Sequence, residues 1–167
     1  MNSSDCTILL VDDDADTVFL LRRAMQKANL NYPVQVAKDG QEAIDYLSHQ
    51  GAYSDREQFP APALMLLDLK MPRKNGFEVL EWVRQQPGLQ RLIVVVLTSS
   101  NQATDVNRAY DLGSNSYLVK PAGFDAILAM LKTIKLYWLQ LSERPDLLSP
   151  GPGPLSAPAP PDQHGET

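Results

Sequence analysis

Short apolar runs alternate with segments of helical periodicity along most of this chain. Five runs are rich in Val, Ile and Leu, and most are bounded by Asp, Gly or Pro, as expected of strands. The predicted strands cover residues 7–11, 33–37, 63–67, 92–97 and 116–119. Strands that alternate with helices predict repeated βα units around a parallel sheet.

The segments between these runs carry apolar residues at spacings of three and four, which favours amphipathic helices. In the first of them Val18, Leu21 and Met25 follow this spacing, and Asp14 stands where an N-cap is expected. Three of the predicted helices begin after Asp14, after the Asp39-Gly40 turn and at Gly76. The other two cover residues 103–112 and 124–142. The last helix is the longest, and Gly113 is expected to close the fourth as a left-handed C-terminal cap.

Two segments do not follow this pattern. Residues 51–62 mix Gly, Pro and charged residues without periodicity and are predicted to form a surface loop. From Pro145 onward the chain holds seven of its thirteen prolines and almost no aliphatic pattern. Such a segment buries too little apolar surface to offset the entropy lost on ordering. We therefore predict one folded domain over residues 5–142 and a disordered Pro-rich tail over 145–167.

Composition and charge exclude several classes of protein. A chain of 167 residues can build one core without disulfides, and its only cysteine, Cys6, fits a reducing cytoplasm. The net charge of −5 opposes nonspecific binding to DNA or anionic membranes. No run approaches the roughly 20 apolar residues of a membrane span. We expect a cytoplasmic protein that does not bind DNA itself.

Acidic residues follow the first and third predicted strands: Asp12 and Asp13 after one, and Asp68 after the other. Because the carboxyl ends of parallel strands meet at one edge of the sheet, these carboxylates should lie within a few ångströms of each other. Like charges raise each other's pKa, and an all-oxygen cluster suits Mg²⁺ better than zinc. A single acidic residue is more often a helix cap or a solvated surface group, but three in register predict a metal site.

The fourth and fifth strands end in residues that can stabilise a phosphoryl group. A carboxylate such as Asp68 can attack phosphorus, and the charge on the phosphoryl oxygens must then be met by a metal and by donors. Thr98 offers a hydroxyl and Lys120 an ammonium at the same edge of the sheet. Either could be an ordinary strand-end or surface residue on its own. Their occurrence at successive strand ends with Asp68 favours phosphoryl chemistry.

Five motifs together resemble the response-regulator receiver family over about residues 5–141. They are LLVDD at 9–13, LLDLKMP at 66–72, NG at 75–76, Thr98, and YLVKP at 117–121. The resemblance implies an α/β, three-layer αβα, flavodoxin-like fold with a five-stranded parallel sheet of order 2-1-3-4-5. It also implies that Asp68 is the phosphoacceptor, that Asp12 and Asp13 are the acid pair, and that the backbone carbonyl of Lys70 is a further ligand to Mg²⁺.

The resemblance further implies a switch. In such domains a Thr98-type hydroxyl moves toward the phosphoryl group, and an aromatic ring at the position of Tyr117 turns inward. These movements change the surface of the fourth helix, fifth strand and fifth helix. The peptide before Pro121 is usually cis in this family. Such a protein is not an enzyme for other substrates and catalyses only its own phosphotransfer and a self-dephosphorylation, which shielding by the Lys70 side chain should make slow.

Other features resemble the stand-alone regulators that partner cyanobacterial and bacterial phytochromes: the loop 51–62, the Thr98-Ser99-Ser100 run and the Tyr137-Trp138 pair. The implied partner is a sensor histidine kinase of the bacteriophytochrome type. We also expect this protein itself to have no DNA-binding output domain. The last helix also carries more apolar residues around Tyr137 than one buried face needs, which predicts a homodimer through this helix or coverage by the first part of the tail.

Two other functions compete with a phosphorylated receiver. An aspartate-nucleophile phosphatase expects a second aspartate two residues after Asp68 as the general acid, but this chain has Lys70 there. A receiver-like module that binds partners without phosphorylation usually lacks one of the acid pair, the acceptor or the lysine. All of these are present here, so phosphorylation is favoured and the unphosphorylated module remains the alternative.

Overall fold

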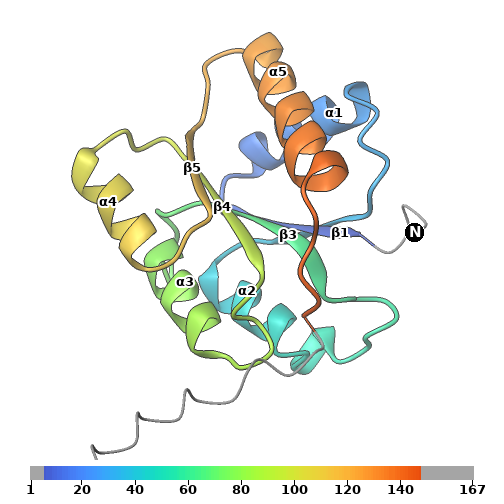
Figure 1. Ribbon diagram of the computed structural model, residues 1–167, viewed down its shortest axis with the longest axis vertical. Coiled ribbons are helices and arrows are strands. Elements are labelled where there is room, and N and C mark those ends of the chain that lie inside the picture. The colour runs from blue at the N-terminus through green and yellow to red at the C-terminus, as the bar shows by residue number, and fades with distance from the viewer. Residues whose placement is uncertain (1–5, 148–167) are drawn as a thin grey trace, which may run out of the picture.

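The computed structural model describes residues 6–147, which form a five-stranded parallel sheet in the order β2-β1-β3-β4-β5 (Figure 1). The strands are β1 (Thr7–Val11), β2 (Val34–Ala37), β3 (Pro62–Leu67), β4 (Ile93–Thr98) and β5 (Ser116–Val119). Each strand begins and ends within one residue of its predicted bounds. The strand order and the parallel direction confirm the predicted fold class.

Helices cover both faces of the sheet, so the fold has three layers. They are α1 (Ala15–Lys27), α2 (Gly40–Leu47), α3 (Gly76–Gln85), α4 (Ala103–Asp111) and α5 (Phe124–Ile134), with a short 3-10 turn, η2 (Gly51–Tyr53), after α2. Helices α1 and α5 lie on one face, and α2, α3 and α4 on the other (Figure 1). Side chains of Asp14, Asp39 and Asn75 cap the first three helices, which explains where these begin.

Successive side chains of a strand point to opposite faces of the sheet, and both faces are buried under helices. On β1, Ile8 and Leu10 pack toward α1 and α5, while Leu9 and Val11 pack toward α2 and α3. All four are 1% exposed or less. Burying one such side chain contributes about 1.5–3 kcal/mol. This two-sided core holds the strand ends, and therefore the residues that follow them, in fixed positions.

The last helix differs from its prediction as one regular helix over 124–142. Helix α5 ends at Ile134 and continues as a π-helix, η3 (Lys135–Leu141), in which the Ser142 N–H bonds to the Tyr137 carbonyl five residues back at 2.7 Å. At the start of this segment the Lys135 ammonium donates to the Ala28 and Asn29 carbonyls at the end of α1. Hydrophobic periodicity alone does not distinguish such a wide turn from an α-helix.

The Lys120–Pro121 peptide also departs from expectation, because no peptide bond among residues 6–147 is cis. The two isomers of a peptide before proline differ by only about 0.5–1 kcal/mol, so local contacts rather than the sequence motif decide between them. The predicted loop at 51–62 is as expected irregular apart from η2. It is anchored by an aromatic cluster of Tyr46, Tyr53 and Phe59, with the Tyr46 hydroxyl donating to the Pro60 carbonyl.

Residues 144–147, which include the first three residues of the predicted tail, pack against the amino-terminal end of the sheet. The Arg144 guanidinium contacts the Cys6 thiol, Arg91 donates to the Asp146 carbonyl at 3.0 Å, and Leu147 packs against the core on the α2–α3 side. Residues 148–167 lie outside the described part, so the disordered tail and the domain limits stay predictions. None of the helices formed by residues 6–147 has the length and apolar character that a membrane crossing requires.

Candidate functional site

Three carboxylates meet at the carboxyl end of the sheet, as predicted from the sequence. Strands β1 and β3 pair in register up to Val11 and Leu67, so the next residue of each, Asp12 and Asp68, stand side by side. The Asp68 N–H continues the ladder by bonding to the Val11 carbonyl at 2.9 Å. One carboxylate oxygen from each of Asp12, Asp13 and Asp68 lies within 4.8 Å of the others.

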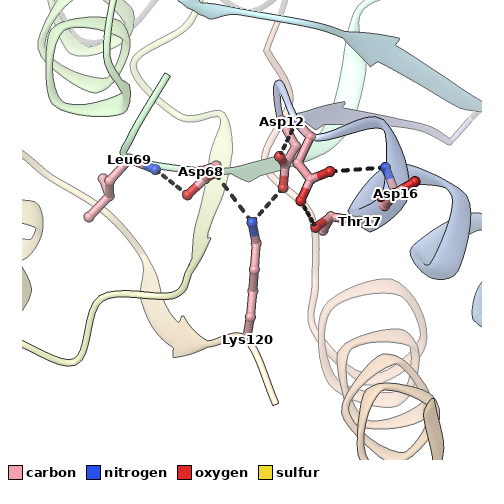
Figure 2. A network of polar contacts seen from close by, with 7 residues as sticks. Asp12, Asp16, Thr17, Asp68, Leu69 and Lys120 are labelled. Carbon is pink, nitrogen blue, oxygen red and sulfur yellow. Dashed lines mark hydrogen bonds and ion pairs between the residues drawn. The ribbon is translucent and has the colours of Figure 1, made fainter. Parts of the chain in front are cut away.

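Lys120 enters the same site from the end of β5. Its ammonium lies 2.6 Å from Asp12 Oδ2 and 3.2 Å from Asp68 Oδ2, between the two carboxylates (Figure 2). The opposite oxygens are held by backbone N–H groups, from Asp14 to Asp12 at 2.9 Å and from Leu69 to Asp68 at 2.8 Å. Both carboxylates are therefore fixed in orientation before any ligand binds.

The charges in this site are only partly balanced. Burial raises the pKa of Asp12 above its ordinary value, although the hydrogen bond from Lys120 opposes this. Burial alone would lower the pKa of Lys120, but its bonds to Asp12 and Asp68 outweigh burial and raise it. One ammonium cannot neutralise three carboxylates, so the cluster can accept a further cation.

The donors fit a hard divalent ion. They are carboxylate oxygens only, which Mg²⁺ and its close analogue Mn²⁺ prefer, and Asp13 is exposed, which leaves room for water in the coordination shell. Asp14, the next acidic residue, instead caps α1 by accepting from the Asp16 N–H. Lys70, whose carbonyl is the remaining predicted ligand, is exposed on the loop after β3, and its part in binding stays a prediction.

The two predicted switch residues lie on β4 and β5, the strands on the Lys120 side of β3. Thr98 ends β4 and is 1% exposed, and its carbonyl accepts from the Lys120 N–H at 2.8 Å. Tyr117 lies on β5, packs against the cluster that contains Phe77, and donates from its hydroxyl to the Ser100 carbonyl at 2.8 Å. Burial raises the pKa of this phenol, which keeps it protonated as a donor.

A link from this switch to α4 was not predicted from the sequence. The Ser100 hydroxyl donates to the carboxylate of Asp105, in the first turn of α4, at 2.5 Å. Tyr117, Ser100 and Asp105 thus form a continuous chain from β5 to α4. Ser100 stands two residues after Thr98, and this spacing was the only sequence signal for its position near the site.

The geometry agrees with a comparison against known families. A family model for the response regulator receiver domain matches residues 8–132. The chain belongs to this family. It is 37% identical to the response regulator Rcp1 of Synechocystis sp. over 133 residues, which cover 80% of this chain and 88% of that protein.

Solved structures of similar proteins place this receiver domain more narrowly. Its fold resembles the phosphorylated cyanobacterial phytochrome response regulator RcpA with a TM-score of 0.79 and 34% identity, covering 85% of this chain and 99% of that one. It also resembles the Mn²⁺-bound form of Rcp1 with a TM-score of 0.75 and 36% identity, covering 84% and 99%. The resemblance to phytochrome-associated regulators is therefore confirmed.

Proposed function

We propose that this receiver domain accepts a phosphoryl group on Asp68 from the phosphohistidine of a sensor histidine kinase, with Mg²⁺ bound. The observation that carries the proposal is the Lys120 ammonium held between Asp12 and Asp68, beside a third carboxylate. Asp12, Asp13, Asp68 and the backbone carbonyl of Lys70 would hold the ion. The relatives Rcp1 and RcpA support it, since structures of them are described as Mn²⁺-bound and phosphorylated, respectively.

In the transfer, an oxygen of Asp68 attacks phosphorus and forms an O–P bond as the N–P bond to the kinase histidine breaks. The electron pair of that bond stays on the imidazole nitrogen. The Lys120 ammonium already lies 3.2 Å from Asp68 Oδ2. It can therefore bind a phosphoryl oxygen, where negative charge develops in the transfer, without a large movement. When bound, the ion would neutralise the remaining charge on the phosphoryl oxygens and the acid pair.

Phosphorylation would be read at the surface formed by α4, β5 and α5. The Thr98 hydroxyl would bind a phosphoryl oxygen, and Tyr117 would report this through its bond to Ser100, which in turn holds Asp105 of α4. A partner that binds this surface would distinguish the two states. The only reactions catalysed would be the phosphotransfer and a slow self-dephosphorylation.

The kinase is proposed to be of the bacteriophytochrome type, and both proteins are proposed to act in the cytoplasm. The names of several similar proteins support the first point, among them the bacteriophytochrome response regulator RtBRR at 41% identity. The single buried cysteine, Cys6, is compatible with the second.

Acetyl phosphate with Mg²⁺ should add about 80 Da to the intact protein. The Asp68→Asn variant should gain nothing, because an amide cannot replace the carboxylate as nucleophile, whereas Asp125→Asn, an exposed change on α5, should gain as the wild type does. Intact-mass spectrometry with and without Mg²⁺ measures this. A wild-type protein that never gains the mass would favour the unphosphorylated binding module instead.

We also propose that the receiver domain forms a homodimer through α5 and η3. Leu136, Tyr137 and Leu141 are 51%, 55% and 68% exposed, which is unusual for so many neighbouring large apolar side chains. Tyr137 and Trp138 also line a groove between the end of α5 and strand β5. The alternative, coverage by the first part of the tail, is not supported for residues 143–147, which cross the amino-terminal end of the sheet to its α2–α3 face, where Leu147 packs (Figure 1).

Sedimentation velocity tests this dimer. The sedimentation coefficient of the wild type should rise with concentration, and that of Tyr137→Glu should stay at the monomer value because a charge would be buried in the interface. Phe19→Glu is the matched control: Phe19 is 62% exposed, but it lies on α1, away from the groove. A wild type that is monomeric at every concentration would rule out the dimer.

A further inference from the structure

The loop that joins β3 to α3 is tied to the start of α2 by a pair of residues outside the site described above. The Arg73 guanidinium donates from Nε to Asp39 Oδ2 at 2.8 Å, and its Nη2 forms an ion pair with the same oxygen at 2.7 Å. Beside this pair, the Gly40 N–H donates to the Lys74 carbonyl at 3.1 Å. The loop therefore has a side-chain anchor and a backbone anchor on α2.

Asp39 is built into the fold as a fixed anion. Its other oxygen, Oδ1, caps α2 by accepting from the Glu42 N–H at 2.9 Å, and the residue is 8% exposed. Burial raises the pKa of Asp39, but the hydrogen bonds from Glu42 and Arg73 outweigh burial and hold the pKa below its ordinary value. Asp39 is thus charged at neutral pH and cannot rotate away from Arg73 without losing its role as the cap.

The backbone of Arg73 gives a second, independent sign that its side chain matters. Arg73 has a φ of 61°, in the left-handed region that favours glycine. A branched or long side chain is unfavourable there, and such strain persists where surrounding contacts enforce it. Glycine would fit the backbone better, so arginine at this position is explained by what its guanidinium holds.

The held loop is the one that carries a predicted ligand of the ion. Asp68 stands immediately before the loop, and at its far end the Gly76 N–H donates to the Leu69 carbonyl at 2.9 Å. Lys70 lies between these anchors, three residues before Arg73. Because the loop is short and fixed at both ends, we expect loss of the Arg73 anchor to alter the direction of the peptide groups before it.

We propose that Asp39 and Arg73 are positioning residues for the divalent ion: their bond sets the loop conformation that turns the Lys70 carbonyl toward the acid cluster. Neither side chain belongs to the acid cluster of Asp12, Asp13 and Asp68. This inference rests on the proposed function, since it concerns the same metal site. Groups that orient a ligand in this way typically change metal affinity by about 10- to 100-fold when removed.

Titration of the 167-residue chain with Mn²⁺, followed by the electron paramagnetic resonance signal of the free ion, tests the proposal without any phosphorylation. Arg73→Leu and Arg73→Gly should both weaken binding by about 10-fold. The glycine variant relieves the left-handed strain yet still lacks the guanidinium, so it separates the ion pair from the backbone. Asp39→Asn combined with Arg73→Leu should bind no more weakly than the weaker single variant, because both remove one interaction.

Arg22→Leu is the matched control, since Arg22 is exposed on α1 and its guanidinium donates to the Val34 carbonyl at the start of β2. It should bind Mn²⁺ as the wild type does. Thermal unfolding of each variant without metal shows whether the effect is on binding or merely on stability. If the wild type binds Mn²⁺ and both Arg73 variants bind it equally well, the inference is wrong. If the wild type binds none, the proposed function itself fails.

Discussion

The Lys120→Met variant should accept a phosphoryl group from acetyl phosphate at least about 100-fold more slowly than the wild type, yet bind the divalent ion as tightly or more tightly. The ammonium lies 2.6 Å and 3.2 Å from the two buried carboxylates and is the donor nearest to Asp68 Oδ2. Removing it removes charge stabilisation in the transfer. It also removes a positive charge that repels the ion, so the two measurements should move in different directions.

Rates of mass gain and Mn²⁺ titrations measure both effects. Lys132→Met, an exposed lysine on α5, is the matched control and should change neither. A Lys120→Met variant that gains mass at the wild-type rate would show that the ammonium has no part in the transfer. A variant that loses both mass gain and Mn²⁺ binding would instead indicate that the site collapses without its central cation.

The same variant should show a characteristic pH dependence of stability without metal. Lys120 lowers the pKa of Asp12, which burial raises above its ordinary value of 3.8, so removing the ammonium raises it further. A carboxyl group whose pKa is higher in the folded state binds more protons there than in the unfolded chain. The free energy of unfolding should therefore fall as pH rises from about 3.8 through the pKa of folded Asp12, and added Mg²⁺ should restore it.

Much of this site could be predicted because each of its parts follows a strand. Two-sided burial makes strands such as β1 continuous apolar runs, so their ends are marked by the first charged residue, here Asp12. Once the sheet order is right, the register of β1 and β3 places Asp12 beside Asp68, and Lys120 follows β5 at the same edge of the sheet. The resemblance then supplied the roles that register cannot.

Contacts between loops could not be predicted in the same way. Asp39 was read only as part of a turn before α2, and nothing in its neighbourhood marks Arg73, 34 residues later, as its partner. The Ser100–Asp105 bond and the π-helical turn after Ile134 are similar cases. In each case the deciding geometry is set by packing of elements that the hydrophobic pattern places only approximately.

The Gly76→Ala variant should unfold more easily by about 3 kcal/mol and should lose most of its stabilisation by Mg²⁺. A Cβ at Gly76 would lie 2.2 Å from the Asp68 carbonyl oxygen and 2.8 Å from the Leu69 Cα. These are backbone atoms, which cannot swing aside as a flexible side chain can. The added methyl group must push α3 away from β3 or displace the peptide that carries the phosphoacceptor.

Helix propensity alone predicts the opposite sign for this change, because alanine is favoured over glycine by about 1 kcal/mol inside a helix. The direction of the shift in urea-induced unfolding, measured with and without Mg²⁺, therefore tests the close approach itself. Gly88→Ala is the matched control: a Cβ there meets nothing within 4 Å, so its stability should be unchanged or slightly higher. If Gly76→Ala were as stable as Gly88→Ala and responded fully to Mg²⁺, α3 would not need to approach the end of β3 so closely. The site would then depend on its side chains and not on the tight turn that joins them.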